Sequence, residues 1–235
     1  DDIVTQIIGE FDMQWQHSVP LTKSWISEYE KIYVPKPIIT PIKHQNIQPN
    51  LMQQEALTSL TTLRNNHKNK ALLISATGTG KTYLSAFDVK NLDPKRILFV
   101  VHRENIARDA MNTFKNIIKN HTFGIFTGSE KDINSDYIFS TVQTIHKKEY
   151  RKMFKPDTFD YIIIDEVHRA GAESYQELMN YFTPSFLLGM SATPERSDNF
   201  DIYKMFDYNI AYEIRLQQAM EYNLLCPFHY YGVSE

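Results

Sequence analysis

Residues 71–82 read ALLISATGTGKT, and this stretch decides the fold. The largely apolar run Ala71–Ser75 predicts a buried strand, and a helical pattern begins at Lys81. Between them, Gly78 and Gly80 let the backbone turn so that its N–H groups point inward. A strand, a glycine-rich turn and a helix N-terminus in this order form a nest that attracts anions. The stretch therefore predicts a phosphate-binding loop.

The spacing of this loop fits the nucleotide-binding pattern GxxxxGK[ST] except at the first position, where Ser75 replaces the usual glycine. The lysine of such a loop reaches the β- and γ-phosphates, and the hydroxyl that follows it can ligate Mg²⁺. Because the loop joins an expected strand to an expected helix, we interpret it as a nucleotide site rather than an unrelated glycine-rich turn. The residues expected around the phosphates are Thr77, Gly78, Thr79, Gly80, Lys81 and Thr82.

A second stretch, YIIIDEVH at 161–168, brings two acids to the end of another apolar strand. In a parallel sheet this strand can run beside the 71–75 strand and end at the same edge. Asp165 would then lie close to Thr82 and to the Mg²⁺ of the nucleotide. Glu166 would be placed to orient or deprotonate the attacking water. Two acids at a strand end can also be a solvated turn, but the phosphate loop favours the catalytic interpretation.

Strand patterns and helical patterns alternate along the rest of the chain. The strand cores are continuously apolar, which is typical of a parallel sheet covered by helices on both faces. We therefore expect an α/β fold, mostly parallel, that binds ligands at the carboxyl ends of its strands. Expected strands lie at 71–75, 96–101, 122–126, 136–140, 161–164 and 186–190, and expected helices at 53–66, 81–92, 104–119 and 173–182. Residues 202–232 fit a short helix, a strand, a helix and a last strand.

The first 45 residues differ from the remainder and set the expected domain boundary. Residues 11–33 have helical apolar spacing, and the proline-rich segment VPKPIITPIK at 34–43 is typical of an extended linker. We therefore divide the chain into a helical flank with its linker at 1–45 and a nucleotide-binding domain at 46–235. Because the sequence begins without Met, we expect it to be a piece of a longer protein.

Composition excludes several classes of protein. The formal net charge of −3 argues against a chain that wraps nucleic acid over its whole surface, although a local basic face is compatible with it. A lone cysteine, Cys226, rules out an internal disulfide and suits a reducing compartment. The longest apolar runs are about five residues, far below the ~20 that span a bilayer. We expect a cytoplasmic protein without a membrane partner.

Three segments in order, ATGTGKT, DEVH and SAT (Ser191–Thr193), resemble motifs I, II and III of the superfamily 2 helicases and translocases, in the DExH branch related to the DEAD/DEAH-box proteins. MQQEAL around Gln53, VVHRENIA around Arg103, FTG and STVQTI resemble four further motifs of the same group. SATPERSD resembles the extended motif III of the type III restriction and excision-repair-like helicases. The resemblance covers about residues 46–200 and implies the first RecA-like lobe of such a motor.

The resemblance also implies roles at the nucleotide. Gln53 would hydrogen-bond the adenine edge and select ATP. Lys81, Thr82 and Asp165 would hold the phosphates and Mg²⁺, and Glu166 would be the catalytic base.

Further roles implied by the resemblance concern coupling and nucleic acid. His168 would connect the ATP site to a partner lobe, and Ser191 and Thr193 would link hydrolysis to movement through the Asp165–His168 turn. Taken alone, these residues could be a surface histidine and strand-end turn residues. The residues implied to face nucleic acid, mainly its sugar-phosphate backbone, are Arg103, Thr127, Gly128, Thr141 and Gln143.

The local signals for nucleic acid are weaker than the motifs. Arg103 alone could be a solvated helix start. The basic run HKKEYRKMFK at 146–155 could touch phosphates, but a solvated helix face is the favoured interpretation.

We therefore expect the ATP-binding motor lobe of a nucleic-acid-dependent ATPase that moves on or unwinds DNA or RNA, with DNA the favoured partner. A motor that translocates on double-stranded DNA without unwinding it stays open as the alternative. A small-molecule kinase and a non-catalytic binding module fit the paired DEVH and SAT segments less well. Motifs IV to VI and their arginines have no counterpart at 195–235, so we expect a second lobe elsewhere and near-background hydrolysis by this piece alone. Residues 1–45 weakly resemble the end of a phospholipase D-type nuclease module, and an ordinary helical flank is the alternative.

Overall fold

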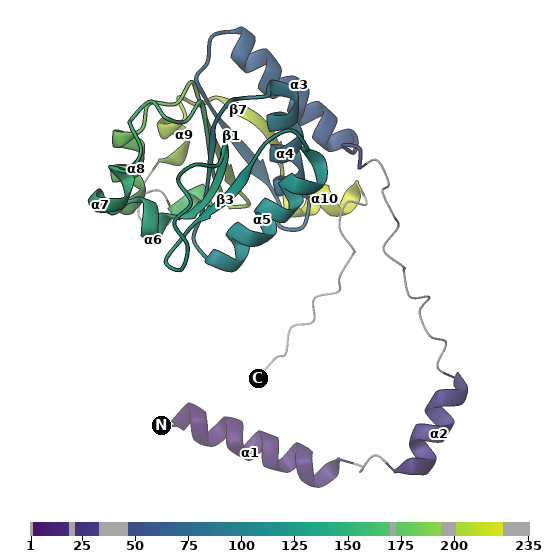
Figure 1. The fold of residues 1–235 in the computed structure, drawn as a ribbon. Coiled ribbons are helices and arrows are strands. Elements are labelled where there is room, and N and C mark those ends of the chain that lie inside the picture. Colours follow the sequence, from purple (N-terminus) through teal and green to yellow (C-terminus); the bar gives the residue numbers. More distant parts are fainter. Residues whose placement is uncertain (1, 19–21, 33–46, 170–172, 194–200, 223–235) are drawn as a thin grey trace. The chain divides into compact units, whose positions relative to one another are not determined.

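A computed structural model describes residues 2–18, 22–32, 47–169, 173–193 and 201–222 of the chain (Figure 1). The chain divides into two units, residues 1–46 and residues 47–235. The expected proline-rich linker, most of the SATPERSD segment and the last expected strand lie outside the described residues.

The first unit contains two helices, α1 (Asp2–His17) and α2 (Lys23–Ile32). Each carries an aromatic pair on its surface: Phe11 stacks on Trp15, and Trp25 stacks on Tyr29. The resemblance of this unit to the end of a nuclease module stays a prediction.

The second unit is built around a seven-stranded sheet in the order β3-β4-β2-β5-β6-β1-β7, and every strand pair is parallel. This confirms the parallel sheet predicted from the continuously apolar strands. The strands are β1 (Lys70–Ser75), β2 (Ile97–Val101), β3 (Phe123–Phe126), β4 (Tyr137–Thr141), β5 (Tyr161–Ile164), β6 (Phe186–Ser191) and β7 (Ile210–Ile214).

Helices cover both faces of the sheet, as the sequence predicts (Figure 1). One face packs against α3 (Leu51–Asn65), α4 (Lys81–Leu92), α5 (Glu104–Ile117) and α10 (Leu216–Glu221). The other face lies under α6 (Val142–Ile145), α7 (Lys148–Arg151), the 3₁₀ turn Val167–Arg169, α8 (Glu173–Tyr181) and α9 (Ile202–Met205). Successive residues of a strand therefore enter opposite hydrophobic clusters, for example Leu72 and Leu73 of β1.

A buried ion pair ties three elements of the first face together. Arg64 of α3 donates two hydrogen bonds to Asp88 of α4, at 2.9 and 2.6 Å. The Tyr161 hydroxyl of β5 donates a third, at 2.7 Å. Asp88 is 1% exposed, so these three bonds replace the water that its carboxylate loses on folding.

One sequence expectation about the sheet is wrong. β1 and β5 do not run side by side, because β6 lies between them and pairs with both. Ser191, the last residue of β6, is the first residue of the SAT segment. The strand that carries the third motif thus separates the strands that carry the first two. Among the described residues, the structure contains no helix long and apolar enough to cross a membrane.

Candidate functional site

The phosphate loop joins β1 to α4 as the sequence predicts. Gly78 and Gly80 have φ values of 87° and 85°, in the left-handed region that favours glycine. Gly80 is the N-cap of α4, and a Cβ built on it would lie 2.9 Å from the side-chain nitrogen of Gln53. The loop therefore needs glycine at this position both for its backbone angle and for its packing.

Ser75, the departure from the usual pattern, has a local role. Its Oγ hydrogen-bonds with the hydroxyl of Thr79, which also donates to the Ala76 carbonyl at 2.7 Å. Ser75 and Thr79 are both buried. The serine thus braces the loop from inside, which a glycine could not do.

Lys81 lies folded back over its own loop. Its Nζ donates to the carbonyl oxygens of Ser75 at 2.9 Å and Ala76 at 3.2 Å. Burial lowers the pKa of Lys81, while the charges of Asp165 and Glu166 act in the opposite direction. The ammonium is therefore held within electrostatic range of both acids.

The two acids lie at the same edge of the sheet as the loop. β6 pairs its Ser191 with Ile74 of β1 and its Gly189 with Ile164 of β5, so all three strands end nearly level. Since neighbouring strands lie about 4.8 Å apart, the ends of β1 and β5 are separated by about 10 Å. A nucleotide triphosphate with its cation can span that gap.

Asp165 sits where its charge is unfavourable. Burial, followed by the neighbouring charge of Glu166, raises the pKa of Asp165 to about 6, although Lys81 and the Glu166 N–H oppose that shift. The Glu166 N–H donates to Asp165 Oδ1 at 2.9 Å. Glu166 itself has a φ of 54°, a strained angle for a residue with a side chain. The turn therefore holds the Asp165 carboxylate in an unfavourable environment, which a bound cation would relieve.

Oxygen donors at this edge suit Mg²⁺. Thr82 is the second residue of α4, directly after the loop, and Asp165 directly follows β5. Mg²⁺ prefers oxygen ligands and usually takes only one or two from protein, with waters and phosphate oxygens completing its shell. The part of the chain that the structure describes has no group of three or more His, Cys, Asp or Glu residues able to hold a metal by themselves.

The three predicted coupling residues lie next to one another. His168 Nδ1 is 3.1 Å from Glu166 Oε2 and 3.1 Å from Ser191 Oγ. Ser191 Oγ also accepts from the Thr193 N–H at 3.2 Å. A continuous polar chain therefore runs from the acid pair across β6 to the segment that follows it.

Gln53 is nearly buried and tied to the phosphate loop. Its Nε2 donates to the Gly80 carbonyl at 3.2 Å, and its Oε1 accepts from the Asn50 N–H at 3.0 Å. Asn50 in turn accepts from the Gln53 N–H, which completes the N-terminal cap of α3. The side chain couples α3 to the loop, and its contact with adenine stays a prediction.

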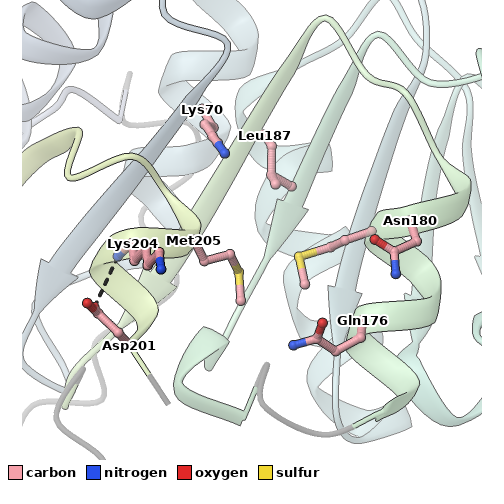
Figure 2. A pocket seen from close by; sticks show the side chains of 8 residues that line it. Lys70, Gln176, Asn180, Leu187, Asp201, Lys204 and Met205 are labelled. Atoms are coloured by element: carbon pink, nitrogen blue, oxygen red, sulfur yellow. Dashed lines mark hydrogen bonds between the residues drawn. The ribbon is translucent and has the colours of Figure 1, made fainter. Parts of the chain in front are cut away.

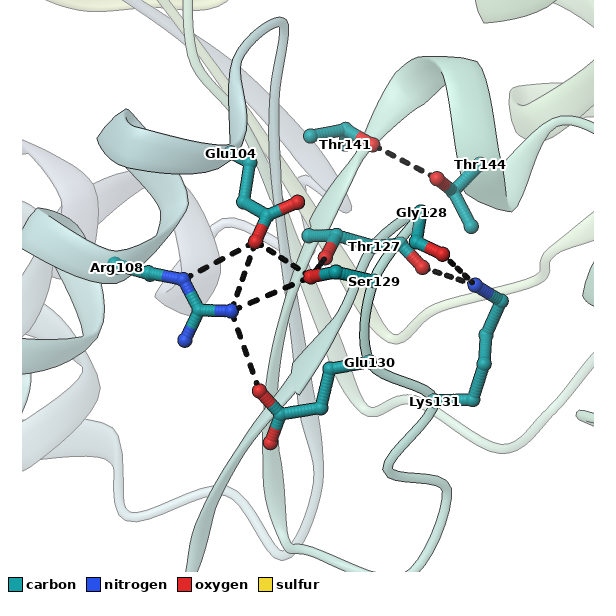
Figure 3. A network of polar contacts seen from close by, with 9 residues as sticks. All are labelled: Glu104, Arg108, Thr127, Gly128, Ser129, Glu130, Lys131, Thr141 and Thr144. Atoms are coloured by element: carbon teal, nitrogen blue, oxygen red, sulfur yellow. Dashed lines mark hydrogen bonds and ion pairs between the residues drawn. The ribbon is translucent and has the colours of Figure 1, made fainter.

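The predicted nucleic-acid residues lie at the carboxyl ends of β2, β3 and β4, but they do not all face solvent. Arg103, Gly128 and Gln143 are exposed. Thr127 has no exposed surface, and its hydroxyl lies 3.4 Å from that of Ser129. Thr141 is buried and pairs with the Thr144 hydroxyl at 3.0 Å (Figure 3). Both threonine side chains are buried in the turns that carry the exposed groups, and a role of these five residues at nucleic acid stays a prediction.

A polar network around this surface was not predicted. Glu104 and Arg108 of α5 contact Ser129 and Glu130 of the turn after β3 (Figure 3). A Glu followed four residues later by Arg is a recognisable helical pair, so Glu104–Arg108 could have been found in the sequence. Its bonds to residues 129 and 130 depend on the packing of β3 against α5, which no local pattern reveals.

A separate pocket lies away from these groups. It has a volume of about 580 Å³ and includes Lys70 and Leu187, near the starts of β1 and β6 (Figure 2). These are the amino ends of the strands, opposite to the edge that carries the phosphate loop.

Comparisons with known proteins agree with this geometry. Residues 46–196 match the family model described as type III restriction enzyme, res subunit. The type I restriction enzyme EcoAI endonuclease subunit of Escherichia coli is 32% identical over 77% of this chain and 23% of its own length. The putative ATP-dependent helicase IRC3 of Saccharomyces cerevisiae is 29% identical over 77% of this chain and 28% of its own length. The chain thus spans about a quarter of the length of these relatives.

A solved structure gives the fold. A nuclease-deletion mutant of the type ISP restriction-modification enzyme LlaGI, in complex with a DNA substrate mimic, superposes with a TM-score of 0.61. It is 20% identical, and the match covers 76% of this chain and 21% of that one. The parallel sheet accordingly has the fold of a RecA-like lobe. From its family model and its motifs, the chain belongs to the type III restriction enzyme res subunit family, within the superfamily 2 helicases.

Proposed function

We propose that this chain is the ATP-binding motor lobe of a nucleic-acid-dependent ATPase, which couples hydrolysis of Mg-ATP to movement on or unwinding of DNA. The observation that carries the proposal is the common edge shared by the phosphate loop, the Asp165–Glu166 turn and the polar chain through His168 and Ser191. Membership of a helicase family supports the same conclusion.

Each residue at the nucleotide has a defined task in this proposal. Lys81 leaves the two carbonyls of its own loop and binds the terminal phosphates, while Thr82 and Asp165 hold the cation. A bound Mg²⁺ would neutralise charge on the phosphates. Glu166 orients the attacking water and accepts its proton at a carboxylate oxygen. Gln53 contacts the adenine and is linked to the phosphate loop by its hydrogen bond to the Gly80 carbonyl.

Coupling follows from the contacts around His168. Glu166 and Ser191 share its Nδ1, so a change of charge at Glu166 alters the hydrogen bond that reaches β6. Thr193 belongs to the same chain of contacts, because its N–H donates to Ser191 Oγ. We propose that this chain of contacts relays the state of the nucleotide to a second lobe elsewhere in the full-length protein. An arginine from such a lobe is worth about 10³- to 10⁵-fold in rate in comparable systems, so the isolated chain should hydrolyse ATP at near-background rates.

DNA rather than RNA is the proposed polymer, because the LlaGI complex contains a DNA substrate mimic. The restriction-enzyme relative keeps translocation on double-stranded DNA as a second candidate. Strand displacement by the full-length protein on a partial duplex supports unwinding, and displacement of a bound protein roadblock without strand separation supports translocation. A cytoplasmic location is proposed from the lone cysteine.

The test of the function is ATP hydrolysis by the full-length protein with and without DNA. We expect DNA to raise kcat, and Lys81→Ala to reduce kcat/KM by about 10²- to 10³-fold, because the charge that stabilises the phosphates is lost. Lys95→Ala, at an exposed lysine before β2, is the matched control and should retain activity. A hydrolysis rate that does not change with DNA, or that is the same in Lys81→Ala as in wild type, would contradict the proposal.

A further inference from the structure

The turn after β3 presents an exposed backbone to the proposed nucleic-acid surface. The Thr127 N–H donates to the Glu130 carbonyl at 2.7 Å, and Phe126 and Lys131 form an antiparallel bridge below it. Gly128 lies at the exposed tip. A tight four-residue turn closed in this way has few bonds of its own, so its position depends on what holds it from outside.

Two side chains hold the turn from opposite sides (Figure 3). From α5, Glu104 Oε1 accepts from the Ser129 hydroxyl at 2.7 Å and from Arg108 Nη2 at 2.8 Å. From the other side, Lys131 Nζ donates to the carbonyls of Thr127 and Gly128. That ammonium also lies 4.7 Å from the centre of the Tyr150 ring. Arg108 completes the arrangement by reaching Glu130 at 3.3 Å.

The position of Glu104 is unusual for an acid on such a surface. It directly follows Arg103, an exposed residue expected to contact phosphates. The Ser129 hydroxyl, with Arg108, holds the pKa of the Glu104 carboxyl at about 2, so the group is charged at every physiological pH. A fixed negative charge repels phosphates, so any benefit of this side chain to binding must come from geometry.

We propose that Glu104 is a positioning residue for nucleic-acid binding, which fixes the Thr127–Glu130 turn to the first turn of α5. This contact sets the distance between the Arg103 side chain and the exposed backbone of Gly128, so that both can contact one sugar-phosphate backbone. The inference rests on the proposed function and adds to it a device that aligns two separate segments. Phosphate contacts of this kind fix register and orientation rather than sequence.

An electrostatic role for Glu104 makes the opposite prediction. If the acid only tuned surface charge, its removal would strengthen DNA binding, and removal of the nearby Glu130 would do the same. If the acid positions the turn, its removal weakens binding although a negative charge is lost. Ser129→Ala separates the two further, because it removes the same contact without any change in charge.

The experiment measures DNA affinity of the full-length protein by fluorescence anisotropy with a labelled single-stranded oligonucleotide, at several salt concentrations. We expect Glu104→Ala and Ser129→Ala each to weaken binding by about 5- to 10-fold, as for the loss of one buried or charge-assisted hydrogen bond. The slope of log K against log salt should fall by about 1 if one phosphate contact is lost with the turn. Glu104→Gln keeps an acceptor for Ser129 and should recover part of the affinity.

Controls separate alignment from folding and from charge. Glu130→Ala removes an exposed acid from the same turn that contacts only Arg108 among the described side chains, and it should change affinity by less than about twofold. The double variant Glu104→Ala/Ser129→Ala should bind no more weakly than Glu104→Ala, because both remove one contact. The thermal midpoints of the Glu104 and Ser129 variants should stay unchanged, while the DNA concentration for half-maximal stimulation of their ATPase rises.

Distinct results would overturn the inference and the function. Equal or tighter binding by Glu104→Ala, or an equal loss in Glu130→Ala, would show that Glu104 does not position the turn even though the wild-type protein binds DNA. Failure of the wild-type protein to bind DNA would overturn the proposed function and this inference together.

Discussion

At the scale of one residue, Asp165 lies in an environment that disfavours its ionised form. Its carboxylate is partly buried beside Glu166, and its pKa is raised to about 6 from an ordinary value near 4. The folded state therefore binds the proton more tightly than the unfolded state does. Ionisation of Asp165 then reduces stability, and that reduction develops as pH rises through about 4 to 6.

The first prediction is that Asp165→Asn stabilises the nucleotide-free protein at pH 7 while it abolishes Mg²⁺-dependent hydrolysis. The gain in free energy of unfolding should be about 1–2 kcal/mol after allowance for partial exposure, and it should vanish near pH 3.5. Urea denaturation at both pH values measures it. Asp157→Asn, at an exposed position, is the matched control and should be neutral. Equal stability of Asp165→Asn and wild type at pH 7 would contradict the prediction.

Gly80 is a second residue whose environment specifies its type. A side chain there would meet both a left-handed backbone angle and the amide of Gln53. We predict that Gly80→Ala lowers the free energy of unfolding by about 1–2 kcal/mol and weakens nucleotide binding.

Urea denaturation and titration with a fluorescent ATP analogue would check this prediction for Gly80. Gly128 has open space around the corresponding position, so Gly128→Ala should leave stability unchanged and serves as the comparison. A Gly80→Ala protein of wild-type stability and affinity would show that the loop can shift away from Gln53.

At the scale of elements, the sequence predicted where the strands lie along the chain better than it predicted their order in the sheet. The apolar runs, the phosphate loop and the DEVH turn each have local signatures, and the structure contains all of them. The insertion of β6 between β1 and β5 has no local signature, because pairing partners are chosen by packing across the whole sheet. The same limit applies to the Arg64–Asp88 pair, whose members come from two helices that meet only in the folded chain.

The candidate site follows the same division. Lys81, Asp165 and the His168–Ser191 contact come from motifs, and the strand ends bring them to one edge. The burial of Thr127 and Thr141 could not be predicted, because a motif fixes the type of residue and not the direction of its side chain. Glu104 carries no such signal, because an acid next to Arg103 has no evident role at a phosphate.

The packing of β6 against α9 gives a prediction at the element scale. Phe206 follows α9, and its ring fills the space beside Gly189 of β6, where a Cβ would overlap the ring atoms. Gly189→Ala should therefore lower the free energy of unfolding by about 1–3 kcal/mol through overpacking.

The double variant Gly189→Ala/Phe206→Leu tests the cause by removing the outer ring atoms. It should be more stable than the sum of the two single variants predicts, because the added methyl then occupies released space. Thermal or urea denaturation of the four proteins gives the coupling. If the two changes in free energy of unfolding simply added, the alanine would destabilise β6 itself rather than clash with the Phe206 ring.

At the scale of the whole molecule, the second unit contains its own core. Both hydrophobic clusters are built from residues between Met52 and Ala219, one on each face of the sheet. The described helices of residues 1–46 contribute no member to either cluster. Stability of the motor lobe should thus be a property of residues 47–235.

The last prediction is that removal of residues 1–46 leaves the thermal midpoint of the lobe within about 2 °C, since 1 kcal/mol shifts the midpoint of a domain this size by roughly 2–4 °C. Circular dichroism of the two proteins measures it. A matched truncation of residues 201–235 removes Ile202, Phe206 and Ile214 from the two clusters, and that protein should fail to unfold cooperatively. If the N-terminal truncation lowered the thermal midpoint by several degrees while nucleotide affinity also fell, residues 1–46 would contribute to the motor lobe itself. An unchanged midpoint with unchanged affinity assigns the ATP site to the sheet and its own helices.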